Sequence, residues 1–291
     1  MAYKQKSRTF RKRESKEEFA ARKKAEREAA YEMIDESISK IMGSTDSFKS
    51  YLDFQARMDR YPSSNALLIM AQCPNATQLK SAEVWNGLGV LINSGEKPIH
   101  ILKPKEFTDD KGEKRTAFNT VYVFDISQTN AEPQPAAPLE SNPKKLVKAM
   151  VNSSPLERVA VDELPIEHST VFYDNESNRL LILRKSDGVQ LFKDMTRELA
   201  LCEIAKGCDE YKRDECMPSA ICASYMLSKK YGVDYGDINL NEISKAWSGM
   251  ENKDIRTMLT MASDSLYSIG KDVFVELSKM KEKAAKENPD R

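Results

Sequence analysis

The chain has 291 residues, with 45 basic and 45 acidic side chains, so its formal net charge is zero. Charged residues make up 31% of it and hydrophobic residues 40%, and the mean hydropathy is -0.59. This composition indicates a soluble globular protein long enough for about two domains, and it excludes a uniformly basic nucleic-acid-binding protein. No apolar run approaches the roughly 18 residues of a membrane span. The charged N-terminus lacks the apolar region of a secretory signal, so we expect a cytoplasmic protein.

Five cysteines, an odd number in a long chain, indicate reduced thiols rather than a disulfide framework. Four of them, from Cys202 to Cys222, follow a C-x5-C-x7-C-x5-C spacing that matches no common zinc site. The glycines also form no phosphate-binding motif. We therefore expect neither a metal nor another cofactor, and no small-molecule substrate.

Residues 1–44 are predicted to be a basic helical segment. Residues 1–30 hold eleven Lys/Arg and five Glu, a local balance of +6 that leaves -6 for the remainder. The pattern Ser15-Lys16-Glu17-Glu18 is a capping box and predicts the start of a helix that ends near Gly43. Its apolar residues recur at helical spacing and predict a docked face: Tyr31, Ile34, Ile38 and Ile41. The basic run is either a solvated helix or an arm that binds nucleic acid.

Residues 45–130 read as a compact α+β unit. Short helices are expected over 48–54, over 63–71 with Ser63 or Ser64 as cap, and from Ser81 towards Gly95. Residues 99–102 and 120–124 are rich in β-forming residues, and residues 109–112 between them have turn chemistry.

Residues 131–150 are expected to be a linker, because four prolines lie among small and polar residues between 131 and 143. In residues 151–291 a β-hairpin is expected over 171–174 and 180–184. Four helices follow, over roughly 190–206, 214–231, 239–248 and 253–280. The fold class is therefore α+β with two domains, the second mostly helical.

A series of short motifs in the first domain carries a family resemblance. It comprises residues 65–72 (NALLIMAQ), Pro74, Ala76, Thr77, Trp85, Leu88, Gly89, Gly95, Glu96, Lys97, Ile99, Pro104 and residues 124–129 (FDISQT). Over residues 45–130 the series resembles the N-terminal domain of antirestriction proteins of the ArdC type, which conjugative plasmids and integrative elements carry. The chain departs from that pattern at Val90, where family members commonly have an arginine.

The resemblance implies binding of single-stranded DNA. Such a site needs cations along a groove and aromatic faces on which bases stack. The candidate DNA-binding residues are Arg57, Arg60, Asn65, Gln72, Lys80, Trp85, Lys97, Lys103, Lys105, Arg115 and Tyr122. Residues 45–130 hold ten Lys/Arg and ten Asp/Glu, so charge must cluster on one face to form a site. The competing interpretation makes Trp85 a core residue and gives Asn65 and Gln72 the role of tying loops together.

The second domain of ArdC-like proteins resembles a zinc metallopeptidase with H-E-x-x-H on a helix. In that motif two histidines four residues apart ligate zinc, and the glutamate is the general base. Here Arg197 and Leu201 stand at the histidine positions and only Glu198 remains. The third, acidic ligand is replaced by Ile221 or its neighbours. The surrounding sequence, including residues 223–234 and 243–247, still resembles the family, so we expect a zincin-like domain without peptidase activity.

Three functions are compatible with these patterns. The first is a non-catalytic ArdC-like protein that binds single-stranded DNA and protects a mobile element against host restriction. The second is an interaction module that binds a restriction, defence or conjugation protein without DNA. The third is an enzyme with an unorthodox site in which Glu198 works with Cys202 or Glu203.

Overall fold

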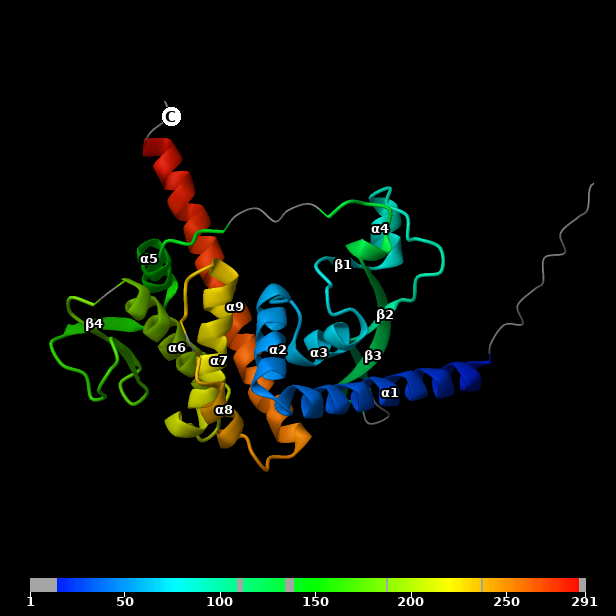
Figure 1. The fold of residues 1–291 in the computed structure, drawn as a ribbon, viewed down its shortest axis with the longest axis horizontal. Helices are drawn as coiled ribbons and strands as arrows, with labels where there is room; N and C mark the ends of the chain where they lie inside the picture. The colour runs from blue at the N-terminus through cyan, green and yellow to red at the C-terminus, as the bar shows by residue number, and fades with distance from the viewer. Residues whose placement is uncertain (1–14, 109–111, 134–138, 187, 237, 288–291) are drawn as a thin grey trace, which may run out of the picture.

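The computed structural model describes residues 15–108, 112–133, 139–186, 188–236 and 238–287. In these residues two small three-stranded sheets lie on either side of a group of helices (Figure 1). The predicted α+β class is confirmed. No helix in the described part of the chain has an apolar stretch of the length that a bilayer requires.

The first half contains helices α1 to α4 and the first sheet. Its elements are α1 (Lys16–Met42), α2 (Thr45–Arg57), α3 (Ser63–Gln72), β1 (Leu79–Lys80), α4 (Ala82–Gly87), β2 (Ile99–Thr108), β3 (Lys114–Asp125) and the 3-10 turn η1 (Ile126–Gln128). The sheet has the order β1-β3-β2, with both pairs antiparallel. The strands β2 and β3 thus extend well beyond the predicted segments. Of the predicted turn at 109–112, residues 109–111 lie outside the described residues.

The second half contains a mixed sheet and five helices among the described residues. Its elements are α5 (Pro143–Ser153), β4 (Glu157–Val161), β5 (Val171–Asp174), β6 (Arg179–Leu183), α6 (Gly188–Lys206), α7 (Arg213–Tyr231), α8 (Leu240–Ala246) and α9 (Asn252–Glu287). The order is β4-β6-β5, with β4 parallel and β5 antiparallel to β6. The predicted hairpin and the four helices that follow it are confirmed.

Three local predictions were wrong. Neither Ser63 nor Ser64 caps α3; Pro62 is the N-cap residue, and the hydroxyl of Ser263 on α9 accepts the N–H of Ser63 at 3.3 Å. The helix α4 ends at Gly87 rather than near Gly95. Part of the predicted linker is α5, which starts at Pro143 after the Asn142 cap and buries Leu146, Ala149 and Met150.

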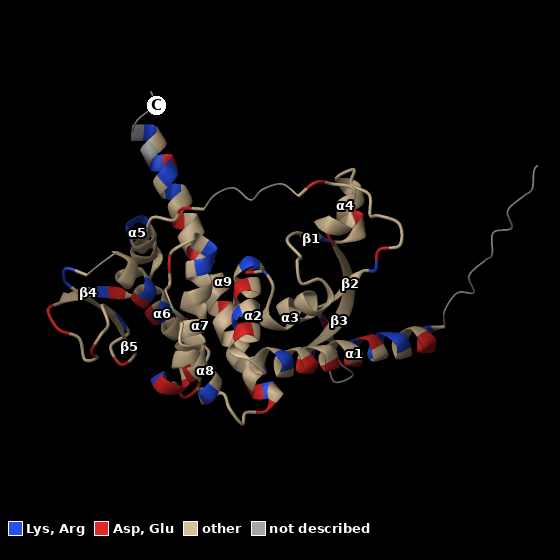
Figure 2. Ribbon diagram, in the orientation of Figure 1, with Lys and Arg blue, Asp and Glu red and all other residues tan. Residues whose placement is uncertain are grey.

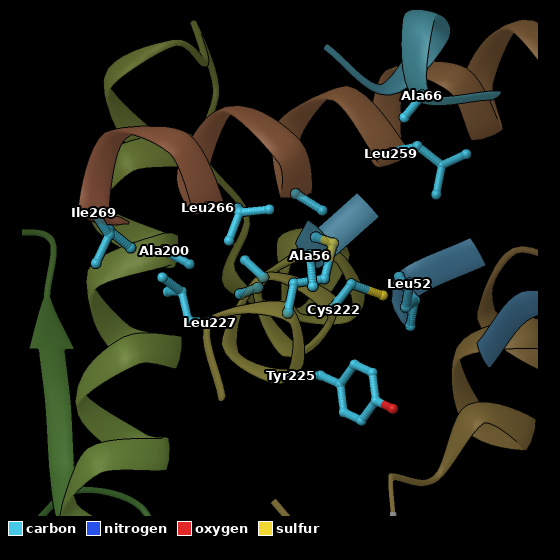
Figure 3. Close-up of a cluster of buried hydrophobic side chains, with 14 of the residues drawn as sticks. Leu52, Ala56, Ala66, Ala200, Cys222, Tyr225, Leu227, Leu259, Leu266 and Ile269 are labelled. Carbon is cyan, nitrogen blue, oxygen red and sulfur yellow. The ribbon is translucent and has the colours of Figure 1, made fainter. Parts of the chain in front are cut away.

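The two halves share one continuous hydrophobic core. Figure 3 shows buried side chains from α2, α3, α6, α7 and α9 in one cluster, among them Leu52, Ala56, Ala66, Ala200, Cys222, Leu227, Leu259, Leu266 and Ile269. Polar contacts cross the same boundary: the Tyr225 hydroxyl donates to Asp53 at 2.7 Å, and the Lys230 ammonium lies 2.6 Å from Asp59. Because core and ion pairs both cross between the halves, we expect them to unfold together.

Helix α1 begins at the predicted capping box, in which Ser15 accepts the N–H of Glu18 and the Glu18 carboxylate accepts the N–H of Ser15. Its C-terminal half buries the predicted isoleucines at positions 34, 38 and 41. Acidic and basic residues are interspersed along it (Figure 2). Residues 15–30 hold five Lys/Arg and four Glu, so the strongly basic run falls mostly on residues 1–14, outside the described residues.

The N-terminal half of α1 docks on β3 through Glu26. The carboxylate of Glu26 accepts the hydroxyls of Thr120 at 2.6 Å and Tyr122 at 2.8 Å, and lies 2.8 Å from the Lys23 ammonium. That ammonium also lies over the Tyr122 ring, 4.9 Å from its centroid. Burial alone would raise the pKa of Glu26, but the hydrogen bonds from Lys23, Thr120, Tyr122 and Arg22 together hold that pKa well below its ordinary value.

This lowered pKa predicts that acid loosens α1. A carboxyl whose pKa is lower in the folded state stabilises that state above its unfolded pKa, about 4.3 for Glu, and the contribution is lost as the pH falls below it. We expect amide exchange in α1, corrected for the intrinsic pH dependence, to rise below about pH 4. In Glu26→Gln exchange should already be raised at neutral pH. Glu28→Gln, which removes an exposed ion pair with Lys24 on the same helix, should behave as the unmodified chain; equal effects of the two variants would contradict the assignment.

Candidate functional site

The distal half of the β2–β3 ribbon presents two chemically different faces. Paired residues in antiparallel strands share a face, and successive residues alternate between faces. One face, here called the basic face, carries three cations and no acidic group among its six residues: Lys103, Lys105, Phe107, Arg115, Ala117 and Asn119. The opposite face carries one cation and one carboxylate: Pro104, Glu106, Thr108, Lys114, Thr116 and Phe118. Charge is therefore segregated although the ribbon lies in a neutral domain.

Three of the predicted DNA-binding residues meet on the basic face. Lys103, Lys105 and Arg115 are all exposed, and Phe107 beside them exposes 45% of its surface. The guanidinium of Arg115 lies 3.3 Å from the Glu113 carboxylate near the turn. Phe107 is not one of the predicted DNA-binding residues; it gains its relevance from the strand register that sets it opposite Arg115.

Four further predicted cations lie on other elements, and one of them, Lys80, lies on β1. Arg57 and Arg60 are exposed at and just after the end of α2, where Arg57 donates to the carbonyl of Pro74 at 3.3 Å. Lys97 is exposed in the segment that precedes β2. The predicted set is thus distributed over several elements, and only Lys103, Lys105 and Arg115 share one strand face.

Trp85 is a core residue, as the competing interpretation held. It is 2% exposed, and its indole N–H donates to the carbonyl of Phe124 at 2.9 Å. The ammonium of Lys80 lies over the same ring, 5.2 Å from its centroid. A buried and hydrogen-bonded indole offers no free face to a nucleobase, so the assignment of Trp85 to base stacking was wrong.

Asn65 and Gln72 cover the open edge of β2. The Asn65 amide exchanges two hydrogen bonds with the backbone of Leu102, both 2.8 Å long. The Gln72 amide does the same with the backbone of His100, at 2.9 Å each. These contacts satisfy backbone groups that would otherwise be unpaired at a sheet edge. They give both amides a structural role in place of the predicted contact with DNA.

Tyr122 lies on the opposite face from the three cations, next to His100, and its hydroxyl is bonded to Glu26 of α1. It therefore belongs to the docking of α1 and does not extend the basic face. The sequence carried no signal for this pairing, because Glu26 and Tyr122 are far apart in the chain.

The second site predicted from the sequence is the helix α6, where Arg197 and Leu201 stand at the expected positions of the two histidines of an H-E-x-x-H motif. Leu201 is fully buried in the core. Arg197 lies 3.0 Å from the Asp194 carboxylate and 3.2 Å from that of Glu198, and it donates to the Ser169 hydroxyl at 2.8 Å. A guanidinium has no acceptor lone pair, so neither position supplies a metal ligand.

Glu198 is fully buried and saturated with donors. Its two oxygens accept Nη2 of Arg213 at 2.7 and 2.8 Å, Oε2 accepts the Tyr173 N–H at 2.9 Å, and Oε1 accepts Nε of Arg197. Among the described residues no group of three or more His, Cys, Asp or Glu is arranged to hold a metal. The residues at this position do not fit a divalent metal.

The unorthodox enzyme gains no support from this geometry. Cys202 is 2% exposed, and burial raises the pKa of its thiol, which disfavours the nucleophilic thiolate. Glu203 accepts the Ser268 hydroxyl at 2.9 Å and pairs with Lys206. Neither residue offers Glu198 a reactive partner.

No protein-family model matches the chain. The curated protein pXO2-81 of Bacillus anthracis, described as uncharacterized, is 24% identical over 308 residues, a match that covers 86% of this chain and 52% of that protein. The chain thus spans about half the length of the curated relative it matches.

Two solved structures of the antirestriction protein ArdC from plasmid R388 resemble the fold. The metal-free form has a TM-score of 0.54 and the Mn(II)-bound form 0.56, each at 13% identity and covering 85% of this chain. The matches cover 98% and 97% of the ArdC chains. Over most of its length, therefore, the chain has an ArdC-like fold.

Proposed function

We propose that the chain is a non-catalytic, ArdC-like antirestriction protein that binds single-stranded DNA in the cytoplasm and protects mobile-element DNA against host restriction. The observation that carries the proposal is the basic face of the β2–β3 ribbon, where Lys103, Lys105 and Arg115 share one strand face with the exposed ring of Phe107. The fold shared with an antirestriction protein supports the biological role.

The basic face has the two components that a single-strand site requires. Lys103 and Lys105 are two residues apart on β2, a separation of roughly 7 Å that suits contacts to successive backbone groups. Arg115 lies directly opposite Phe107, with Cβ atoms roughly 5 Å apart, so a cation adjoins the aromatic ring on which a base would stack. All six residues of the basic face are exposed or half-buried, so none of them forms a buried site that would read base edges, and binding is expected to show little sequence preference.

Salt dependence tests the role of the lysines. Each neutralised phosphate of a single strand adds roughly -0.7 to the slope of log K against log salt, so three engaged cations give a slope of about -2. In Lys105→Ala the slope should be less steep by about 0.7. The affinity at each salt concentration is measured by fluorescence anisotropy with a labelled oligothymidine. The matched control is Lys114→Ala, an exposed lysine on the opposite face. Absence of binding by the unmodified chain at low salt would refute the proposal.

Two phenylalanines of similar exposure, one on each face, allow the contributions of the two faces to be measured separately. Phe107 on the basic face is 45% exposed, and Phe118 on the other is 41% exposed. Loss of one base-stacking ring costs about 1–3 kcal/mol, so Phe107→Ala should weaken binding about 5- to 150-fold. Phe118→Ala should leave the affinity within about twofold if stacking is confined to the basic face. The same titration measures both, and equal losses would contradict the choice of face.

A protein partner is the second candidate function, and one surface favours it. Val84, Leu88 and Leu91, in and after α4, expose 50%, 61% and 62% of their surfaces. Val84 and Leu88 are four residues apart, in α4 and at its C-cap, and exposed apolar residues at this spacing on a helix are neighbours of the kind found at contact sites for proteins. If this surface, rather than the basic face, is the functional one, a complex with a restriction, defence or conjugation protein will survive nuclease treatment.

A further inference from the structure

We propose that an arginine–carboxylate cluster, formed by Asp194, Arg197, Glu198 and Arg213, replaces a metal centre as the link that holds the second unit together. The consequence is that this chain neither binds nor requires Mn(II) or Zn(II), although a related fold is known in an Mn(II)-bound form. This inference is independent of DNA binding, because it concerns α6 and its neighbours and not the β2–β3 ribbon.

The cluster is electrically balanced within the protein. Asp194 and Glu198 are fully buried, and the side chains of Arg197 and Arg213 are each 20% exposed. Two buried carboxylates without cations would be strongly unfavourable, so the two guanidinium groups supply the charge compensation that a divalent ion would otherwise provide.

The cluster connects three elements that approach one another from separate parts of the chain. Asp194, Arg197 and Glu198 lie on α6, and Arg213 is the first residue of α7. The two carboxylates also accept hydrogen bonds from β5 and from the residue that precedes it. Asp194 accepts the N–H and hydroxyl of Thr170, both at 2.8 Å, and Glu198 accepts the N–H of Tyr173. The outer edge of β5 is thereby fixed against α6.

No acceptor capacity remains for a metal. The Asp194 carboxylate receives four contacts, the two from Thr170 together with those from Gln190 at 3.1 Å and Arg197. Glu198 receives four as well. A carboxylate has about four acceptor positions, so both are filled. A cation that entered would displace these donors and face two guanidinium charges.

The direct test uses the full chain dialysed against a chelator and then titrated with MnCl2 or ZnCl2. A ligand that binds only the native state raises the melting temperature. We expect no stoichiometric heat of binding and the same melting temperature with chelator, Mn(II) or Zn(II). One equivalent of bound Mn(II) or Zn(II) that stabilises the chain and is lost in Glu198→Gln would overturn the proposal.

The structural role of the cluster is tested by amide exchange at Thr170 and Tyr173. Glu198→Gln should raise the opening equilibrium of the hairpin on the order of 100-fold, because it leaves buried guanidinium charge without its partner. The control Glu215→Gln removes an exposed ion pair with Lys212 on α7 and should change it less than about fivefold. Equal exchange in the two variants would overturn the proposal.

A second comparison holds even if Glu198→Gln does not fold. In the double variant Glu198→Met with Arg213→Met both charges of one pair are absent, so no unpaired charge from that pair is left buried. The double variant should therefore melt at a higher temperature than Arg213→Met alone. If it melts at the same or a lower temperature, Glu198 and Arg213 do not stabilise the fold as a pair, and the proposal fails.

Discussion

The organisation of the second unit depends on one constraint: a carboxylate removed from water must be given donors and compensating charge. Asp194 and Glu198 are both fully buried on α6. Arg197 and Arg213 lie beside these carboxylates and compensate their charge. Thr170 and Tyr173 donate hydrogen bonds to them and so hold the hairpin against the same helix. Once those donors are in place, the site has no acceptor for a metal. The contacts that stabilise the hairpin therefore also make this site chemically different from the metal site of a metallopeptidase.

A similar requirement for hydrogen-bond satisfaction shapes the first unit. Helix α3 covers the edge of β2 through Asn65 and Gln72, and α1 covers the ribbon near Thr120 and Tyr122 through Glu26. These contacts occupy the proximal half of the ribbon. The distal half is left exposed, and there the strand alternation gathers three of the four cations on one face. A net charge of zero over the whole chain therefore coexists with a basic surface.

Local signals in the sequence predicted much of the fold. The capping box at Ser15, the hairpin over β5 and β6 and the helices α6 to α9 are each encoded within a few neighbouring residues. The helix α5 also had a local signal, an Asn142 cap before Pro143. The prolines that precede it nevertheless led to the prediction of a linker. The strand β4 was not predicted, since its partner β6 is distant in sequence.

The functional sites were less predictable because they depend on contacts between distant segments. The absence of histidine at positions 197 and 201 could be read from the sequence, whereas the pairing of Glu198 with Arg213 could not. Trp85 and Tyr122 matched the composition of a stacking site, yet one is buried and the other is bonded to α1. The strand register separates Lys105 from Lys114, a distinction that composition alone does not make.

The ribbon is the proposed site of DNA binding, and the α6 cluster has a proposed structural role. Amide exchange over the whole chain, with and without a saturating single-stranded oligonucleotide, tests this division most directly. We expect protection on binding to concentrate in residues 103–108 and 114–119, with no change around Thr170, Tyr173 and α6. Protection centred on α6 and the hairpin, with the ribbon unchanged, would contradict it.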